Sequence, residues 1–231
     1  YPFGLAEQWF IHKCMANFKI ANWYFKHWIT ENVTRLGKIV NERQHDTPEN
    51  WTKKIKELAL EDDDVHVVGI CRMKEEWVYE DREIPRGEWV IILGRRMEYD
   101  EFSKNIKGDF VSQCREVIKS YVMGQTTGYR VASWIRKQGY YSSFKGGLSD
   151  DHSFTVVPAA IDAGLGQLGK HGNLISDVLG SAFRLTPVLT DMPLITDEAR
   201  DIGVDDFCGT CQLCARDCPA DAITHEKHIL L

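Results

Sequence analysis

Four cysteines near the carboxyl end of the chain have the spacing of a metal-binding motif. Cys208, Cys211, Cys214 and Cys218 follow the pattern C-x2-C-x2-C-x3-C, and Pro219 comes directly after the last of them. This pattern is typical of bacterial ferredoxins, in which cysteine thiolates hold a [4Fe–4S] cluster. A zinc site would call for a second C-x2-C pair or a histidine pair at a suitable distance. The motif therefore predicts an iron–sulfur cluster and electron transfer.

The fourth cysteine of this motif raises a question of ligand supply. In two-cluster ferredoxins it binds the other cluster, yet the 231 residues contain no second run of this kind. Either Cys14, Cys71 or Cys114 completes a single cluster, or the sequence is a fragment and the native chain continues beyond Leu231 into another cysteine-rich loop. We favour the fragment, and so expect two clusters in the complete protein. Outside a cluster, Cys71 and Cys114 are expected to be small buried apolar residues.

A glycine-rich segment is the second candidate site. It fits the pattern G-x-G-x-x-G, but a helical stretch precedes it where a dinucleotide-binding fold would have a strand, so a nicotinamide site is not favoured. Glycines allow the backbone to approach a bulky ligand, and the polar residues that follow can contact that ligand. The candidate ligand-binding residues are Gly164, Gly166, Gly169, Lys170, His171 and Asn173.

The composition is that of a folded and mildly acidic protein, 43% hydrophobic and 27% charged. With 28 Lys and Arg against 34 Asp and Glu, the formal net charge is −6, which argues against a nucleic-acid-binding surface. The longest apolar stretches, such as residues 156–161, fall short of the roughly 18 residues that a membrane helix needs. We therefore expect no transmembrane segment in this chain.

Helical and strand-like patterns alternate along the chain, which predicts an α/β or α+β fold. We expect three parts: an aromatic-rich helical segment over residues 1–50, an α/β core over 51–195, and an iron–sulfur module over 196–231 that is incomplete at its end, with a linker at 196–206. The expected elements within the core are a helix from Trp51, buried strands at 65–70 and 89–93, a long helix at 112–139 broken near 124–128, and a helix from Val156.

Five further stretches carry a family resemblance when they are taken in order with the cysteine run. Together they resemble the corrinoid iron–sulfur reductive dehalogenases. Trp77-Val78-Tyr79 and Met97-Glu98-Tyr99 favour this family over its sister family, the epoxyqueuosine reductases, which shares the glycine segment and the ferredoxin module. The stretches are residues 47–56, 68–70 with 77–79, 90–93 with 97–99, 131–140, and 163–185 continuing to 190–194.

The resemblance implies a nitroreductase-like core that holds a base-off corrinoid, with a C-terminal bacterial ferredoxin-type module that supplies electrons. It also implies a tyrosine that gives a proton to the substrate beside a basic residue, and Tyr121 and Arg184 fall at the matching positions. A phenol, with a pKa near 10, is a weak acid until a cation favours its anion, and arginine does this without losing its own charge. The alternative role of Tyr121 is packing with Val117 and Val122.

A short match to a cobalt-ligand motif is not expected to be functional. Residues 64–69 fit D-x-H-x-x-G, by which some corrinoid proteins supply a histidine to cobalt. In those proteins the motif follows a strand, whereas His66 here lies within the β-branched run itself. We therefore expect no histidine on the cobalt.

The resemblance implies an oxidoreductase that removes halogen from a small organohalide through corrinoid cobalt reduced by [4Fe–4S] clusters. One alternative is an epoxyqueuosine reductase-like enzyme acting on tRNA, with Asp150, Asp151 or His152 as the proton donor. Another is a non-catalytic iron–sulfur subunit for electron transfer. Whether the partner is an electron donor or a membrane-anchor protein is left open, as is the location: exported and membrane-associated if respiratory, otherwise cytoplasmic.

Overall fold

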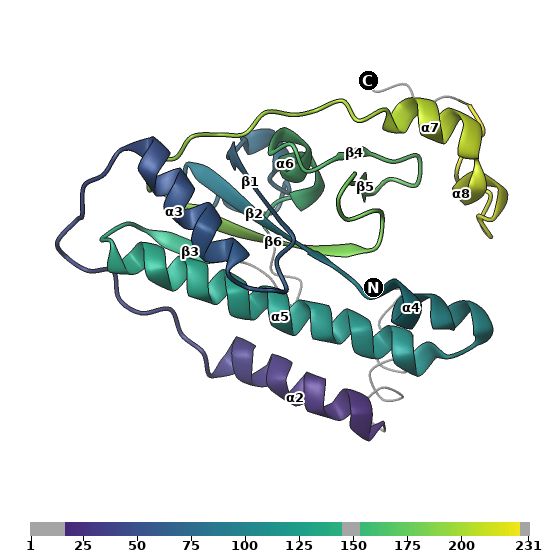
Figure 1. Ribbon diagram of the computed structural model, residues 1–231, viewed down its shortest axis with the longest axis horizontal. Helices are drawn as coiled ribbons and strands as arrows, with labels where there is room; N and C mark the ends of the chain where they lie inside the picture. The colour runs from purple at the N-terminus through teal and green to yellow at the C-terminus, as the bar shows by residue number, and fades with distance from the viewer. Residues whose placement is uncertain (1–16, 145–152, 227–231) are drawn as a thin grey trace.

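A four-stranded antiparallel sheet forms the centre of the computed structural model, which describes residues 17–144 and 153–226. Its strand order is β1-β2-β6-β3. Helices α3 and α5 cover one face of the sheet, and α6 covers the other (Figure 1). The protein is therefore a mixed α/β structure, as the sequence predicts. The elements are β1 (Val67–Arg72), β2 (Trp89–Arg96), β6 (Phe183–Thr190), β3 (Ser142–Phe144), α3 (Pro48–Leu60), α5 (Phe110–Lys137) and α6 (Val156–Asp162).

Burial of the sheet on both faces explains why its strands are apolar without a polar alternation. In β2, Ile91 and Leu93 pack into the core under α3 and α5, whereas Val90 and Ile92 pack into the core under α6. Successive side chains of a strand point to opposite faces, so a strand covered on both sides must be apolar at nearly every position. The two buried strands expected from the sequence are β1 and β2.

Helix α5 runs without interruption over 28 residues, so the predicted break at 124–128 is wrong. Both glycines in that stretch face the sheet. A Cβ at Gly124 would lie closer than 3.0 Å to Oγ1 of Thr186, and one at Gly128 would lie 3.0 Å from Cδ2 of Phe144. The glycines thus let α5 approach the sheet closely, and the packing offsets their low helix propensity.

The segment before the core is only partly helical. Helix α2 (Phe18–Asn32) packs along α5, and Ile20 contacts a small cluster with Cys114 and Ile118. Residues 34–40 have no regular structure, and α3 begins at Pro48, where Oγ1 of Thr47 accepts a hydrogen bond from the Asn50 backbone. A threonine cap followed by proline is a typical helix start.

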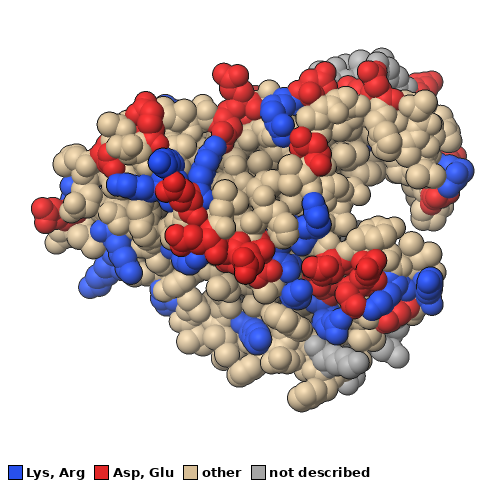
Figure 2. Space-filling model, viewed as in Figure 1, with Lys and Arg blue, Asp and Glu red and all other residues tan. Residues whose placement is uncertain are grey.

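Shorter elements complete the chain and lead to the cysteine motif. Residues 195–203 have no regular secondary structure, and Lys56 binds the Asp197 carboxylate at 2.6 Å, which pins this segment to α3. Basic and acidic side chains are interspersed over the face that Figure 2 shows. Within the described ranges, no helix has the length and apolar character needed to cross a bilayer. The shorter elements are η1 (Glu75–Trp77), α4 (Tyr99–Phe102), η2 (Ser103–Lys107), β4 (Gln167–Leu168), β5 (Leu174–Ile175), α7 (Val204–Cys211) and α8 (Leu213–Arg216).

Candidate functional site

The two residues predicted as proton donor and basic partner lie in contact. Tyr121 is on α5 and Arg184 is near the start of β6, and Nη1 of Arg184 donates a hydrogen bond to the Tyr121 hydroxyl at 3.0 Å. The guanidinium carbon also lies 4.0 Å from the centroid of the Tyr121 ring. Because the phenol oxygen accepts this bond, its own O–H is left to donate elsewhere. The arrangement suits a phenol that releases a proton beside a fixed positive charge.

Arg184 has no carboxylate partner within residues 17–144 and 153–226. Among the described residues, none of the ion pairs involves Arg184, although most other arginines of the structure are paired. Its Nε atom is buried and has no hydrogen-bond partner among the residues that the structure describes. Burial lowers the pKa of Arg184, and the nearby Tyr121 opposes that shift. A cation of this kind can stabilise an anion that forms next to it, such as a phenolate.

A cavity of about 400 Å³ opens beside Arg184. Figure 2 shows the surface hollowed between the end that carries α7 and α8 and the end that carries α4. Its walls are largely apolar with a few polar groups, which is the usual character of a small-molecule site. The lining residues are Met97, Phe102, Gln113, Cys114, Val117, Asn173, Ser181, Ala182, Phe183 and Arg184.

The predicted glycines are enclosed by the chain itself. A Cβ at Gly164 would collide with the backbone oxygen of Glu198, and one at Gly166 with that of Ile175. At Gly169 a Cβ would lie 2.7 Å from the Ile175 side chain. Gly166 and Gly169 are therefore required by the packing of the β4–β5 hairpin, and Gly164 by the close approach of the segment at Glu198. Corrinoid binding by the three glycines stays a prediction.

The polar residues after these glycines have different surroundings. Lys170 is buried, and its Nζ donates hydrogen bonds to the backbone oxygens of Thr224, at 2.8 Å, and Glu226. It therefore fastens the hairpin to the segment that follows the cysteines. His171 is exposed and its Nδ1 accepts a hydrogen bond from the Asn173 backbone, while burial of part of the ring lowers its pKa. Asn173 alone of the predicted ligand-binding residues lines the cavity beside Arg184.

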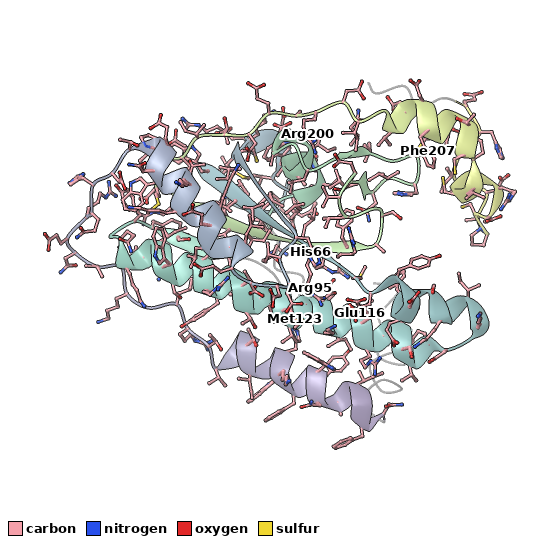
Figure 3. All side chains as sticks on the ribbon, in the orientation of Figure 1. His66, Arg95, Glu116, Met123, Arg200 and Phe207 are labelled. Carbon is pink, nitrogen blue, oxygen red and sulfur yellow. The ribbon has the colours of Figure 1, made fainter. Side chains whose placement is uncertain are left out.

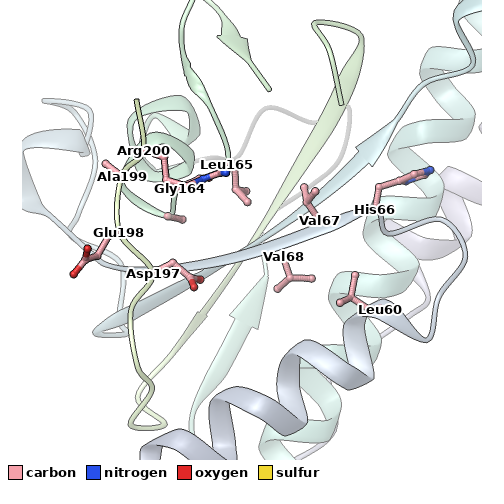
Figure 4. Close-up of a pocket in the computed structure, with 11 residues that line it drawn as sticks. Leu60, His66, Val67, Val68, Gly164, Leu165, Asp197, Glu198, Ala199 and Arg200 are labelled. Atoms are coloured by element: carbon pink, nitrogen blue, oxygen red, sulfur yellow. The ribbon is translucent and has the colours of Figure 1, made fainter. Parts of the chain in front are cut away.

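A second cavity, of about 540 Å³, lies at the edge of the sheet formed by β1, between this strand and the 197–200 segment (Figure 4). Its polar groups are engaged: Arg200 binds Asp177 at 3.1 Å, and the Ile70 backbone donates to Asp197. His66 lies at its edge just before β1, where its Nδ1 accepts a bond from the Arg96 backbone. The structure therefore gives His66 a local partner and no neighbouring ligand set.

Comparison with known proteins identifies relatives of this chain. Tetrachloroethene reductive dehalogenase from Dehalobacter restrictus is 32% identical over 208 residues, which is 89% of this chain and 34% of that protein. Epoxyqueuosine reductase from Leadbetterella byssophila is 45% identical over only 62 residues, 27% of this chain and 19% of that protein. This chain is a homologue of the reductive dehalogenases. It spans about a third of the length of the curated dehalogenases that it matches over most of its residues. No protein-family model matches it.

The fold is also that of a solved reductive dehalogenase. A catabolic reductive dehalogenase in complex with 3-bromo-4-hydroxybenzoic acid superimposes with a TM-score of 0.75 and 23% sequence identity. The alignment covers 90% of this chain and 32% of that structure. The homology predicted from the five sequence stretches is thus confirmed, and the overall fold is shared.

The four cysteines of this reductive dehalogenase homologue lie on two short helices and the turn after them. Cys208 and Cys211 are one helical turn apart on α7, and the left-handed backbone of Gln212, with φ 52°, separates α7 from α8. Backbone hydrogen bonds from Ala222, Ala220 and Ile223 lower the pKa of Cys218, which favours its thiolate. All four thiols are free, but the described residues contain no group of three or more His, Cys, Asp or Glu arranged to hold a metal ion. Cluster binding stays a prediction.

Two other cysteines are buried in the body of the protein. Cys71 lies in the core under α6, where its thiol donates to the Ala159 backbone oxygen and burial raises its pKa to about 12. Such a thiol is a poor metal ligand, because the thiolate is the ligand form. Cys114 lines the cavity beside Arg184. Cys14, Asp150, Asp151 and His152 lie outside the described residues.

Sequence reasoning missed most of the cavity wall. Gln113, Ser181 and Phe183 were not candidates, because they come from α5 and from the start of β6. These segments are about 70 residues apart and meet only when the sheet forms. Their one sequence signal was proximity to the matched positions Tyr121 and Arg184.

Proposed function

We propose that the protein is an oxidoreductase that removes halogen from a small organohalide. The observation that carries this proposal is the contact between Tyr121 and Arg184, with a phenol O–H that is not engaged by the described residues. Arg184 lines the cavity, and no carboxylate among the described residues neutralises it. The names of the relatives support this substrate class. One acts on tetrachloroethene, and another was solved with a brominated hydroxybenzoic acid.

The reaction that we propose replaces halogen by hydrogen. It needs two electrons and one proton and releases halide. Tyr121 would donate the proton from its hydroxyl to the product carbon, and Arg184 would stabilise the phenolate at 3.0 Å until solvent returns the proton. The largely apolar cavity would bind the organohalide and exclude water, which strengthens the effect of the Arg184 charge.

The resident cofactors that we propose are a base-off corrinoid and [4Fe–4S] clusters, two in the complete protein. When bound, the corrinoid supplies low-valent cobalt, the reductant for the carbon–halogen bond. Asn173, the cavity wall on β6 and the exposed His171 between β4 and β5 would contact the corrinoid. The buried Nε of Arg184 is an unsatisfied donor on the same cavity wall. The four free thiols, with Cys218 inclined to the thiolate, suit iron–sulfur ligation.

The cofactors also define the domains that we propose. Residues 51–195 would form a nitroreductase-like corrinoid-binding core, and residues 196–231 a ferredoxin-type module incomplete at its end. Residues 1–50 would be a separate helical segment that packs on the core through α2. The contacts of Lys170 with Thr224 and Glu226 support a module that stays close to the core.

The test uses the complete native protein, purified without oxygen. Its iron and cobalt contents and its ultraviolet–visible spectrum are measured first, and halide release is then followed with tetrachloroethene and with 3-bromo-4-hydroxybenzoic acid. Tyr121→Phe should leave the metal contents unchanged and slow halide release by about 10² or more. Tyr129→Phe is the matched control, because Tyr129 lies on the same helix and its hydroxyl donates to the Arg35 backbone.

Four outcomes would count against the proposal. Zinc in place of iron would remove the cluster, and a protein without cobalt would favour an electron-transfer subunit. If Tyr121→Phe released halide at the wild-type rate, the proton would have to come from another group. Reduction of an epoxide on tRNA in place of halide release would establish the epoxyqueuosine reductase alternative.

A further inference from the structure

Arg184 has a second arginine directly opposite it in the sheet. The antiparallel register of β2 and β6 pairs Arg95 with Arg184. Paired residues point to the same face, and their Cβ atoms are about 5 Å apart. Both side chains face α5, since Arg184 contacts Tyr121 and Arg95 contacts Glu116 of that helix. In Figure 3, Arg95 and Glu116 lie in the layer between the sheet and α5.

Arg95 is buried and its charge is balanced from two sides. Only 6% of its side chain is exposed, and its Nε and Nη2 both contact Oδ1 of Asp64 at 3.1 Å. Its Nη1 lies 3.5 Å from Oε1 of Glu116, whose side chain is 3% exposed. This contact is an ion pair, and Nη1 is buried without a hydrogen-bond partner among the described residues. The same Glu116 oxygen accepts a hydrogen bond from the Glu98 backbone at 3.2 Å, which fixes the carboxylate in place.

The contrast between the two arginines has an electrostatic consequence. Like charges directly opposite each other in a sheet repel, and burial strengthens the repulsion. Asp64 and Glu116 neutralise Arg95, so its charge does not add to that of Arg184. The Tyr121 phenol then experiences mainly the single charge of Arg184, although two cations lie in the same layer.

We infer that Glu116 and Asp64 are positioning residues, which hold and neutralise Arg95 and thereby set the acidity of Tyr121. This inference rests on the proposed role of Tyr121 as the proton donor. Other charged and titratable groups also lie on α5 or on the elements packed against this part of it. They are Arg184 of β6, Arg95 of β2, Asp64 before β1, Glu116 and Lys119 of α5 itself, and His27 of α2, which contacts Gln125.

The test measures the ionisation of Tyr121 directly, by tyrosinate absorbance during a pH titration. Because the chain has eight tyrosines, the signal of Tyr121 is the difference between each protein and the same protein with Tyr121→Phe. Glu116→Gln keeps the size of the side chain and its acceptor for the Glu98 backbone but removes the negative charge. Arg95 is then less neutralised, and the pKa of Tyr121 should fall by about 0.5–1 unit.

Asp64→Asn is an independent second variant, because it removes the other counter-charge of Arg95 and should shift the titration in the same direction. It also keeps the test intact if Glu116→Gln does not fold. Glu57→Gln is the control, since Glu57 is exposed on α3 and pairs weakly with Lys53 at 3.9 Å. This control should leave the titration of Tyr121 unchanged.

Halide release by the complete protein supplies the second measurement. The alkaline limb of its pH profile should move to lower pH in Glu116→Gln and Asp64→Asn, by the same amount as the titration. A lower rate without movement of the limb, or an unshifted titration in both variants, would overturn the inference while leaving the proton-donor role intact. If Tyr121→Phe is fully active, the proposed proton-donor role of Tyr121 fails instead, whatever the titrations give.

Discussion

Replacing Gly124 by alanine should destabilise the protein, although alanine is the better helix former. In an exposed helix the change would gain about 0.8–1 kcal/mol. Here the added Cβ would lie closer than 3.0 Å to Oγ1 of Thr186, whereas ordinary contact begins at 3.4 Å. Thr186 is buried, so its side chain has little free space in which to turn aside.

Overpacking of this kind costs about 1–3 kcal/mol, so after the helix-propensity gain we expect a net loss of up to about 2 kcal/mol in the free energy of unfolding. Urea denaturation followed by circular dichroism measures this loss. Thr186→Ala should relieve it, because the nearest remaining atom of residue 186 would be Cβ, at 3.6 Å. The double-mutant cycle should therefore give a coupling of about 1 kcal/mol or more.

Thr186→Val keeps both branches and should give no relief. Gly37→Ala is the control, because no atom lies within 4 Å of the added Cβ, and its effect should stay within about 0.5 kcal/mol. If Gly124→Ala were stabilising, or if its effect simply added to that of Thr186→Ala, the close approach of α5 to β6 would not be the reason for the glycine. The same contact lies one helical turn from Tyr121, so a helix displaced at Gly124 should also slow halide release.

Three further predictions concern single side chains. Arg184→Lys keeps the charge beside Tyr121 and should impair halide release less than Arg184→Ala; equal rates for the two variants would exclude an electrostatic role. Cys71, with a pKa of about 12, should resist iodoacetamide at pH 8 in the folded, cluster-free chain, whereas Cys218 should be labelled. Peptide mass spectrometry measures the labelling of both cysteines. Early labelling of Cys71 would contradict its burial. Lys54, Asn50 and the Thr47 backbone lower the pKa of Asp46 from 3.8 to about 2, so its contribution to stability is present above pH 4 and lost as the pH falls through 2; Asp46→Asn should lower the midpoint of thermal unfolding at pH 6, and a gap that persisted at pH 2 would refute this.

The strands β1 and β2 could be predicted because burial on both faces leaves a continuous apolar run in the sequence. β6 was not predicted, although it lies between β2 and β3 and pairs with both. Its residues include Arg184 and Pro187, and proline usually argues against a strand in the middle of a sheet. The short β3 covers only Val188–Thr190 of β6, so Pro187 lies beyond that ladder. Tertiary pairing of this kind leaves no local signal.

The predicted break in α5 failed for a related reason. Gly124 and Gly128 weaken an isolated helix, and only the neighbouring Thr186 and Phe144 show why they are needed. The cysteine motif, by contrast, could be recognised at once because its ligands are close together in the sequence. Tyr121 and Arg184 are 63 residues apart, so their contact was predicted by family resemblance and could not have come from spacing.

Arg95 and Glu116 gave no sequence signal, yet they show how the site differs from the rest of the sheet. A buried charge is costly unless it is paired, and Arg95 follows this rule with two carboxylates. Arg184, its cross-strand neighbour, has none among the described residues and contacts a phenol instead. Structural stability alone would favour a carboxylate beside Arg184 as well. In the proposed mechanism, the tyrosine that becomes negative when it gives up its proton would supply this counter-charge.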